Sequence, residues 1–297
     1  MSWKILRILT TDTCNYHCLY CHNEGQTVSK QPKMLSFNQF KFVMEQLHVT
    51  EIQEVRFSGG EPLMNEFTVD MIEWVDANTN YEVGLATNGS LLTEILAQRL
   101  SKTRVMVTLH LPSQSPRNYR HITGGELQRL KNCIALLEKY KIDYSFNYVL
   151  YPKTINNLDE VLNYSLRCGK RIKLLPYIER GFKNFSAEIM KQIDLMVGQF
   201  DCVKEYDENN GITWWKFVNG AVIKMIDSPC YERSISKCRN YAELRLLPDL
   251  RLQSCIFGTP EFLKDADNLP KKMDELWIHF NSCPRSQEAA KFFAGKL

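Results

Sequence analysis

Three cysteines near the start of the chain have the spacing needed to hold an iron–sulfur cluster. Cys14, Cys18 and Cys21 form a C-x3-C-x2-C pattern within one short loop. Three thiolates can bind three irons of a [4Fe–4S] cluster, which leaves the fourth iron without a protein ligand. An open iron can bind a second cofactor and use it in chemistry. The spacing therefore predicts a cluster at these cysteines with one iron available for catalysis.

A zinc site is the main alternative for these cysteines. Zinc takes four nitrogen or sulfur ligands, and His17 and His22 lie near enough in sequence to complete such a set. Disulfides are not expected, because ten cysteines in 297 residues is a modest density and no apolar signal segment opens the chain. The cysteine pattern alone leaves iron and zinc open, including a zinc-binding or cluster-binding protein that is not an enzyme.

Composition excludes several classes of protein. No run of about 18 apolar residues occurs, so we expect no membrane span. The net charge of +3 is small for the length and does not indicate a nucleic-acid partner. Without a secretion signal, the cysteines belong in a reducing cytoplasm, as thiolate ligands or buried apolar residues.

Strand-length apolar runs alternate with helix-length amphipathic stretches over about the first 180 residues. This order predicts an α/β fold of parallel strands joined by right-handed crossovers, and six such units suit a partial (β/α)6 barrel. A doubly wound open sheet is the alternative, because periodicity does not determine closure. The expected strands are Trp3–Leu9, Glu54–Phe57, Glu82–Ala86, Arg104–Leu109, Tyr144–Leu150 and Arg171–Tyr177, and the expected helices are Ser36–His48, Phe67–Ala77, Leu91–Ser101, Glu126–Tyr140 and Asn157–Leu166.

The pattern changes after about residue 180. A helix is expected at Ser186–Val197, and Asn219-Gly220 between two apolar runs predicts a tight hairpin turn. We therefore expect two domains, a partial barrel at residues 1–180 and a smaller, antiparallel-rich extension at residues 181–297. The short strands expected in the extension are Ile212–Val218, Ala221–Ile226, Ala242–Leu247 and Leu252–Ile256.

Unusual segments follow each of the first three expected strands. The cysteine loop follows the first, Ser58-Gly59-Gly60-Glu61-Pro62 the second and Thr87-Asn88-Gly89 the third. Loops at the carboxyl ends of parallel strands build active sites. Glycines let the backbone approach a ligand closely, so main-chain groups of the second segment can hydrogen-bond a ligand's amino group. The three segments are therefore expected to form one site.

The cysteine pattern and Gly59-Gly60-Glu61-Pro62 together resemble the two recurrent signatures of radical S-adenosylmethionine (SAM) proteins. The resemblance implies that a reduced cluster donates one electron to SAM bound at the open iron. A 5′-deoxyadenosyl radical then forms and abstracts hydrogen from a substrate. The protein's part is to position the radical and to exclude water and oxygen. A reductase, flavodoxin or ferredoxin is the implied electron donor.

The segment from Cys238 to Gly258 is similar to the auxiliary-cluster region of the GTP 3′,8-cyclase family of molybdenum-cofactor biosynthesis. Ile122-Thr123-Gly124, residues 156–160 and residues 173–181 agree with the same family in order. The resemblance implies a twitch- or SPASM-like extension that carries a second [4Fe–4S] cluster. The ligands that it implies are Cys238 and Cys255, with Cys230 and Cys283 available to complete the set.

The same resemblance assigns site residues. Arg7, Arg56 and Arg245 match arginines that bind substrate in the family, and arginine forks bind phosphate groups with two hydrogen bonds. The residues that it assigns to SAM binding are Tyr20, Gly59, Gly60, Glu61, Pro62, Thr108 and Ile178.

The chain departs from the family at three positions of this site. Tyr241 stands where the family has a second cysteine, Glu243 where it has an arginine, and Ser145 where it has a lysine. The family's Gly-Gly tail is also absent. Because a glutamate beside a phosphate would repel it, these departures argue against cyclisation of GTP.

The sequence thus favours a radical SAM enzyme with two [4Fe–4S] clusters that acts on a small anionic or nucleotide-like molecule other than GTP. Modification of a ribosomally made peptide is the alternative within the same chemistry. Twitch and SPASM extensions are common in such enzymes, but the first strand is expected to start at Trp3, so an additional N-terminal peptide-recognition domain is not expected.

Overall fold

The computed structural model describes residues 3–21, 31–47, 50–177, 186–227, 235–256, 258–263 and 268–283. The chain folds into two compact units. The first comprises Met1–Leu109, Thr123–Asp143 and Ala242–Ser282, and the second comprises His110–Ile122, Tyr144–Tyr241 and Cys283–Leu297. The expected domain division at residue 180 stays a prediction. No helix among the described residues is long and apolar enough to cross a membrane.

The first unit contains a sheet whose first four strands lie side by side in chain order and run parallel. A fifth strand from the C-terminal part pairs in parallel with the other edge of β1, and two short antiparallel strands follow it. The first four strands thus keep chain order, and β10 extends the sheet at the opposite edge of β1. The strands are β1 (Ile5–Leu9), β2 (Glu54–Ser58), β3 (Glu82–Thr87), β4 (Met106–His110), β10 (Glu243–Leu246), β11 (Arg251–Gln253) and β12 (Glu261–Phe262).

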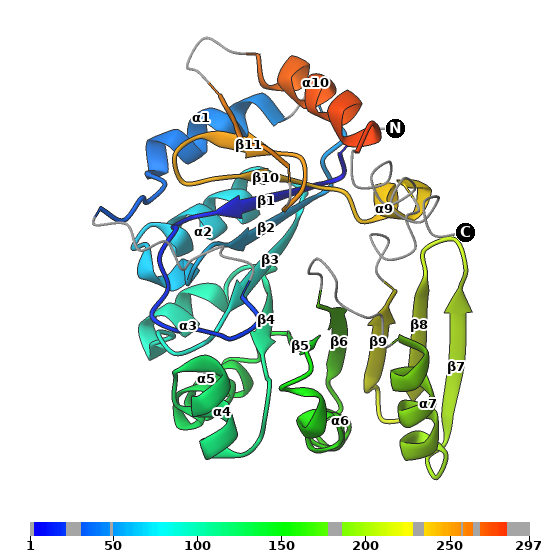
Figure 1. The fold of residues 1–297 in the computed structure, drawn as a ribbon. Helices are drawn as coiled ribbons and strands as arrows, with labels where there is room; N and C mark the ends of the chain where they lie inside the picture. Colours follow the sequence, from blue (N-terminus) through cyan, green and yellow to red (C-terminus); the bar gives the residue numbers. More distant parts are fainter. Residues whose placement is uncertain are drawn as a thin grey trace. The chain divides into compact units, whose positions relative to one another are not determined.

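Helices cover one side of these strands, and Figure 1 shows this for β1, β2 and β3. Leu6 and Ile8 of β1 are fully buried, whereas Arg7 between them is half-buried on the opposite face. This alternation is typical of strands with helices on one side. The helices are α1 (Phe37–Leu47), α2 (Thr68–Asn78), α3 (Glu94–Leu100), α5 (Leu127–Lys139) and α10 (Leu269–Asn281), with a 3₁₀ turn η1 (Pro62–Met64).

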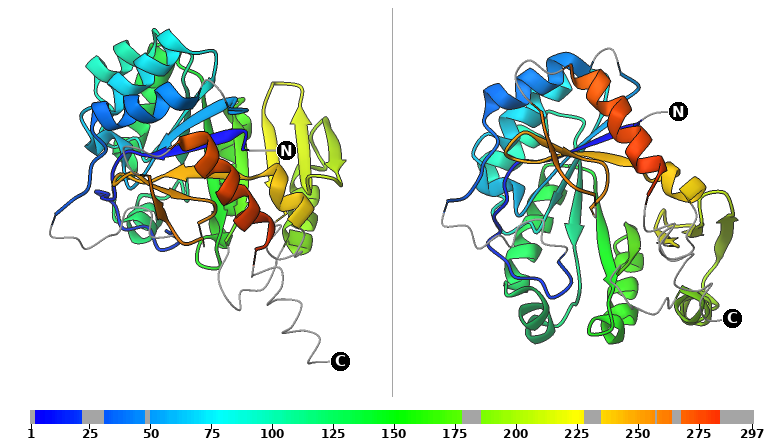
Figure 2. Two further views of the ribbon diagram at one scale, coloured as in Figure 1. Left: turned by 90° about the horizontal axis from the view of Figure 1, so that it is seen from above. Right: turned by 45° about the horizontal axis from the view of Figure 1, so that its top comes forward.

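The start of α1 confirms the predicted helix signal. Ser36 Oγ accepts a hydrogen bond from the backbone N–H of Gln39 (3.3 Å), and Gln39 Oε1 accepts one from the backbone N–H of Ser36 (3.0 Å). This reciprocal pair is a capping box. Helix α10, which the sequence did not predict, lies beside α1 (Figure 2) and is held to the start of the chain by Trp3, whose indole N–H donates to the carbonyl of Met273 (2.9 Å).

The second unit contains strands in the order β5-β6-β9-β8-β7. β5, β6 and β9 are parallel, whereas β8 and β7 continue the sheet in antiparallel pairing. The turn at Asn219-Gly220 is confirmed, since Gly220 has a φ of +85° that favours glycine. The elements are α4 (Pro116–Thr123), β5 (Tyr144–Leu150), η2 (Ile155–Asn157), α6 (Leu158–Arg167), β6 (Arg171–Pro176), α7 (Ser186–Val197), β7 (Cys202–Asp207), β8 (Ile212–Phe217), β9 (Val222–Ile226) and α9 (Ile235–Asn240).

The structure therefore confirms the α/β class, the parallel strands in chain order and the antiparallel strands in the C-terminal part. Tyr144–Leu150 and Ser186–Val197 were predicted with the bounds observed. Among the described residues, the helices and strands that were not predicted are α4, β7, α9, β12 and α10, and the 3₁₀ turns η1 and η2 were not predicted either.

Candidate active site

The cysteine loop begins where β1 ends and runs against the glycine segment that follows β2. The backbone N–H of Gly60 donates to the carbonyl of Thr11 (2.9 Å), and that of Glu61 donates to the carbonyl of Thr13 (2.8 Å). A Cβ atom on Gly60 would lie 1.8 Å from the Thr13 carbonyl oxygen and 2.8 Å from the backbone nitrogen of Cys14. Glycine is therefore required here for the two backbones to meet.

Glu61 links the glycine segment to the loop that follows β3. Its side chain is 1% exposed, and its carboxylate accepts hydrogen bonds from Thr87 Oγ1 (2.6 Å), the backbone N–H of Asn88 (2.8 Å) and that of Leu63 (3.1 Å). Burial raises the pKa of Glu61, while these hydrogen bonds oppose the shift. The side chain of Glu61 thus connects the segment after β2 to the loop after β3.

Asn88 connects the third loop to the first cysteine. Its Nδ2 lies 3.9 Å from Sγ of Cys14 and donates to Oδ1 of Asn15 (2.9 Å), and Nδ2 of Asn15 donates to Oγ of Ser90 (2.8 Å). The backbone N–H of Tyr16 also donates to Sγ of Cys14 (3.3 Å). Thr87-Asn88-Gly89 was expected at this edge because it follows the third strand, but no role was predicted for Asn88.

The turn before α5 also contacts the cysteine loop. The backbone N–H of His17 donates to the carbonyl of Thr123 (2.9 Å). The ring of Tyr16 is buried against Gly125, where a Cβ atom would lie 2.0 Å from Cζ of the tyrosine. The Ile122-Thr123-Gly124 motif therefore leads into a turn that supports the loop, a role that its sequence alone did not indicate.

The three loop cysteines fit a cluster by their chemistry. All three are partly exposed, and none forms a disulfide. Burial, followed by nearby negative groups, raises the pKa of Cys14 to about 11, and burial raises that of Cys18 to about 12. Such thiols bind as thiolates when a metal centre supplies positive charge.

No single-ion site is present among the described residues, because no three Cys, His, Asp or Glu side chains converge on one point. In a [4Fe–4S] cluster each thiolate binds a different iron, so such convergence is not needed. His22, which a zinc site at this loop could use, lies outside the described residues.

The residues assigned to SAM lie mostly around this loop. Tyr20 is buried just before Cys21, Gly59 and Gly60 are half-buried, and Thr108 is half-buried on β4. Pro62 is buried, and its carbonyl accepts hydrogen bonds within the first unit. Ile178 lies outside the described residues.

Two of the three arginines expected to bind substrate, Arg7 and Arg56, are paired with acids. Arg7 donates through Nε and Nη2 to both carboxylate oxygens of Glu243 (2.5 and 3.0 Å), and Arg56 also bonds the same carboxylate through Nη1. Arg56 forms a second two-point bond with Glu54 (2.5 and 2.7 Å). Arg245 lies beside Arg7 on the neighbouring strand and is 5% exposed.

Glu243 is ionised in this setting. Burial would raise its pKa, but the charge and hydrogen bonds of Arg7, followed by the charges of Arg56 and Arg245, lower it to about 2. The sequence marked Glu243 as a departure that would repel phosphate. Its direct pairing with Arg7 and Arg56 was not foreseen.

The expected ligands of the second cluster lie in different parts of the chain. Cys238 is in α9 of the second unit, Cys255 follows β11 in the first, and Cys283 is the last described residue. Cys230 lies outside the described residues. Tyr241, at the family's cysteine position, donates its hydroxyl to the carbonyl of Asn210. The second cluster stays a prediction.

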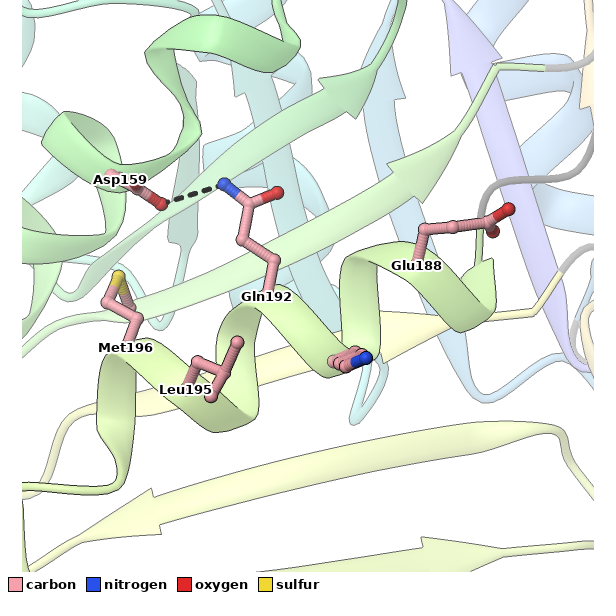
Figure 3. A pocket seen from close by; sticks show the side chains of 6 residues that line it. Asp159, Glu188, Gln192, Leu195 and Met196 are labelled. Carbon is pink, nitrogen blue, oxygen red and sulfur yellow. Dashed lines mark hydrogen bonds between the residues drawn. The ribbon is translucent and has the colours of Figure 1, made fainter.

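A separate hollow of about 530 Å³ lies on α6 and α7 of the second unit. Figure 3 shows its lining, including the hydrogen bond from Gln192 Nε2 to Asp159 Oδ1 (3.0 Å) beside Leu195. None of the expected cluster, SAM or substrate residues lines it.

Comparison with known proteins identifies the family. Residues 8–164, just over half of the chain, match the family model described as Radical SAM superfamily. The chain belongs to this superfamily. The cofactors of this radical SAM chain are accordingly a [4Fe–4S] cluster and SAM.

Among curated relatives, a probable GTP 3′,8-cyclase of Methanococcus maripaludis strain C5 is 24% identical over 295 residues, which cover 96% of this chain and 95% of the relative. A probable GTP 3′,8-cyclase of Methanococcus vannielii is 29% identical over 181 residues, 59% of each chain. The radical SAM chain thus resembles these cyclases over most of its length.

Solved radical SAM structures share the fold. Streptococcus suis SuiB bound to precursor peptide SuiA superposes with a TM-score of 0.71 at 13% identity, covering 95% of this chain and 67% of SuiB. Native anSMEcpe with bound AdoMet has a TM-score of 0.65 at 15% identity, covering 91% of this chain and 79% of that structure.

Proposed function

We propose that this radical SAM enzyme holds its [4Fe–4S] cluster at Cys14, Cys18 and Cys21 and abstracts hydrogen from a small anionic or nucleotide-like substrate other than GTP. The observation that supports the cluster assignment is the double anchoring of the cysteine loop. Gly60 and Glu61 hold its first part through backbone hydrogen bonds, and the turn at residues 123–125 holds its middle.

The residues around the loop have distinct tasks in this proposal. When bound at this loop, SAM would supply the radical chemistry. The main chain at Gly59 and Gly60 would hold the methionine part of SAM, since glycine permits close approach. Tyr20 and Thr108 would orient the nucleoside part, and Ile178, which lies outside the described residues, is assigned to SAM by the resemblance alone. Glu61 and Pro62 act through the shape that they give to this segment.

The charges of the described residues bear on the substrate. Arg7 and Arg56 are neutralised by Glu243 and Glu54, so they do not favour a triphosphate.

Peptide modification is the second candidate. SuiB, whose structure contains its precursor peptide SuiA, shares the fold over 95% of this chain. A neutral arginine cluster also suits a substrate without phosphate. Candidate peptides and small anions are separated by deuterium transfer from labelled substrate into 5′-deoxyadenosine.

A second [4Fe–4S] cluster at Cys238 and Cys255, completed from Cys230 and Cys283, is part of the proposal. It would transfer electrons or shape the substrate pocket. We also propose a reductase, flavodoxin or ferredoxin as electron donor, in a reducing cytoplasm where the thiols stay available.

The test is anaerobic reconstitution followed by iron, sulfide and zinc analysis and measurement of 5′-deoxyadenosine. Wild type is expected to hold about eight irons, as two four-iron clusters require. The triple variant of Cys14, Cys18 and Cys21 to Ala is expected to hold about four and to form no 5′-deoxyadenosine. Cys168→Ala changes an exposed cysteine outside the proposed sites and is the control. Zinc in place of iron, or undiminished cleavage in the triple variant, would refute the assignment.

A further inference from the structure

A compact cluster of charges lies on the face of the first unit's sheet opposite Leu6 and Ile8. Arg7 on β1 is directly beside Arg56 on β2 and Arg245 on β10. Two carboxylates lie two residues earlier on the neighbouring strands, Glu243 before Arg245 on β10 and Glu54 before Arg56 on β2. Both lie opposite Ile5. We call Arg7, Arg56, Glu54 and Glu243 the arginine–glutamate cluster.

Three adjacent arginines would by themselves form an anion site. Like charges on neighbouring strands destabilise a sheet unless an opposite charge is present, and arginine forks match the oxygens of a phosphoryl group. In this chain the opposite charge is built in. Glu243 presents one oxygen to both Arg7 and Arg56 and the other to Arg7.

We propose that Glu243 is a specificity-determining residue that fills the forks of Arg7 and Arg56 and thereby keeps phosphoryl groups out of this part of the site. It acts as an internal counter-ion in the place where a polyphosphate would otherwise bind. This inference rests on the proposed function for its place in the substrate site, but the binding of anions to the arginines does not depend on turnover.

The geometry explains why an anion would not displace Glu243. Both edges of the Arg56 guanidinium already carry bonds, two to Glu54 and one to Glu243. The carboxylate is tethered to its own strand, so it competes as an intramolecular ligand. Glu54 and Glu243 balance the charges of Arg7 and Arg56, which leaves only the charge of Arg245 on this face, and an incoming polyphosphate would meet two carboxylates.

The partial exposure of the cluster makes the proposal testable. The side chains of Arg7, Arg56 and Glu243 are 20, 28 and 19% exposed. A small anion from solvent can therefore reach the arginines once the glutamate is removed. Inorganic tripolyphosphate is a suitable probe, because it carries the phosphate charge of a nucleotide without a base or ribose.

The experiment measures tripolyphosphate binding to reconstituted protein by calorimetry at one low salt concentration. Glu243→Gln and Glu243→Ala are expected to bind at least about tenfold more tightly than wild type, the effect of one charge-assisted hydrogen bond. Glu82→Gln is the matched control, because this substitution removes the same charge. Glu82 is exposed and lies on β3 opposite Glu54. Equal binding by wild type and both Glu243 variants overturns the proposal.

A second measurement uses wild type alone and stands even if the variants fail to fold. Phenylglyoxal labelling of Arg7 and Arg56, followed by mass spectrometry, is expected to proceed at the same rate with and without tripolyphosphate. Protection of either arginine by tripolyphosphate contradicts the proposal. Loss of 5′-deoxyadenosine formation in the cysteine variants tests the proposed function separately, and neither result decides the other.

Discussion

The side-chain amide of Asn88 lies 3.9 Å from Sγ of Cys14 and donates at 2.9 Å to Oδ1 of the adjacent Asn15. One asparagine on the loop after β3 therefore contacts both the first cluster cysteine and its neighbour. Its backbone N–H is in turn fixed by the buried carboxylate of Glu61. Three strand ends are thus joined at the sulfur that we assign to the cluster.

Asn88→Ala is expected to lower the reduction potential of the cluster while leaving its iron content unchanged. Hydrogen bonds to cluster sulfurs stabilise the more negative, reduced form. A hydrogen bond of ~1 kcal/mol corresponds to about 40 mV for a one-electron couple. The measurement is an EPR-monitored redox titration. Ser90→Ala, which removes only the bond from Asn15, is the control, and an unchanged potential in Asn88→Ala would remove the asparagine from this role.

Gly60→Ala is expected to displace the backbone at Thr13 and Cys14 and to reduce cluster occupancy. The new Cβ would meet the Thr13 carbonyl at 1.8 Å, so the two loops must separate. Overpacking of this kind costs about 1–3 kcal/mol. Iron content and the visible absorption of the cluster report the effect. Gly84→Ala is the control, because a Cβ there has only ordinary contacts, the nearest at 3.5 Å. Equal iron in both variants would contradict the expectation.

Gly125→Ala is expected to destabilise the protein through Tyr16, and a double-mutant cycle isolates that effect. The Cβ would lie 2.0 Å from the tyrosine ring, which must then move and take the cysteine loop with it. We expect a loss of about 1–3 kcal/mol in urea unfolding of the single variant. The same change in a Tyr16→Ala background should cost less, because the clashing ring is absent. An equal loss in both backgrounds would show that the ring is not the cause.

Glu243 predicts a specific dependence of stability on pH. Its pKa in the folded protein is about 2, below its ordinary value of 4.5. A depressed carboxyl pKa contributes stability above pH 4.5 that is lost as pH falls toward 2. The difference in unfolding free energy between wild type and Glu243→Gln is therefore expected to shrink by roughly 2 kcal/mol between pH 6 and pH 2.5. Urea denaturation of both proteins after chelator treatment measures it, and a constant difference would place the pKa elsewhere.

Much of the architecture was predictable because local signals agree with it. The capping box at Ser36 and Gln39, the Asn219-Gly220 turn and strand β5 all depend on neighbours in sequence. The missed elements lack such signals. β7 is an edge strand whose residues are mostly exposed, so its sequence has little apolar alternation. α10 is stabilised by Trp3, from the other end of the chain.

The candidate site likewise contains some residues that the sequence could predict and others that it could not. The cysteines and Gly60 could be found because their chemistry demands those residue types at fixed spacing. Asn88, Tyr16 and Gly125 could not, because their roles appear only when three loops meet. The arginines were found by resemblance, but their state was not, since Glu243 reaches Arg7 across 236 residues of sequence.

The parallel pairing of β10 with β1 has a consequence for biosynthesis. β1 leads directly into the cysteine loop, yet one of its two edges has no partner until β10 leaves the ribosome. During most of translation that edge is an open template for unwanted strand pairing. The strand that leads into the cysteine loop therefore gains its second neighbour only after most of the chain has been synthesised.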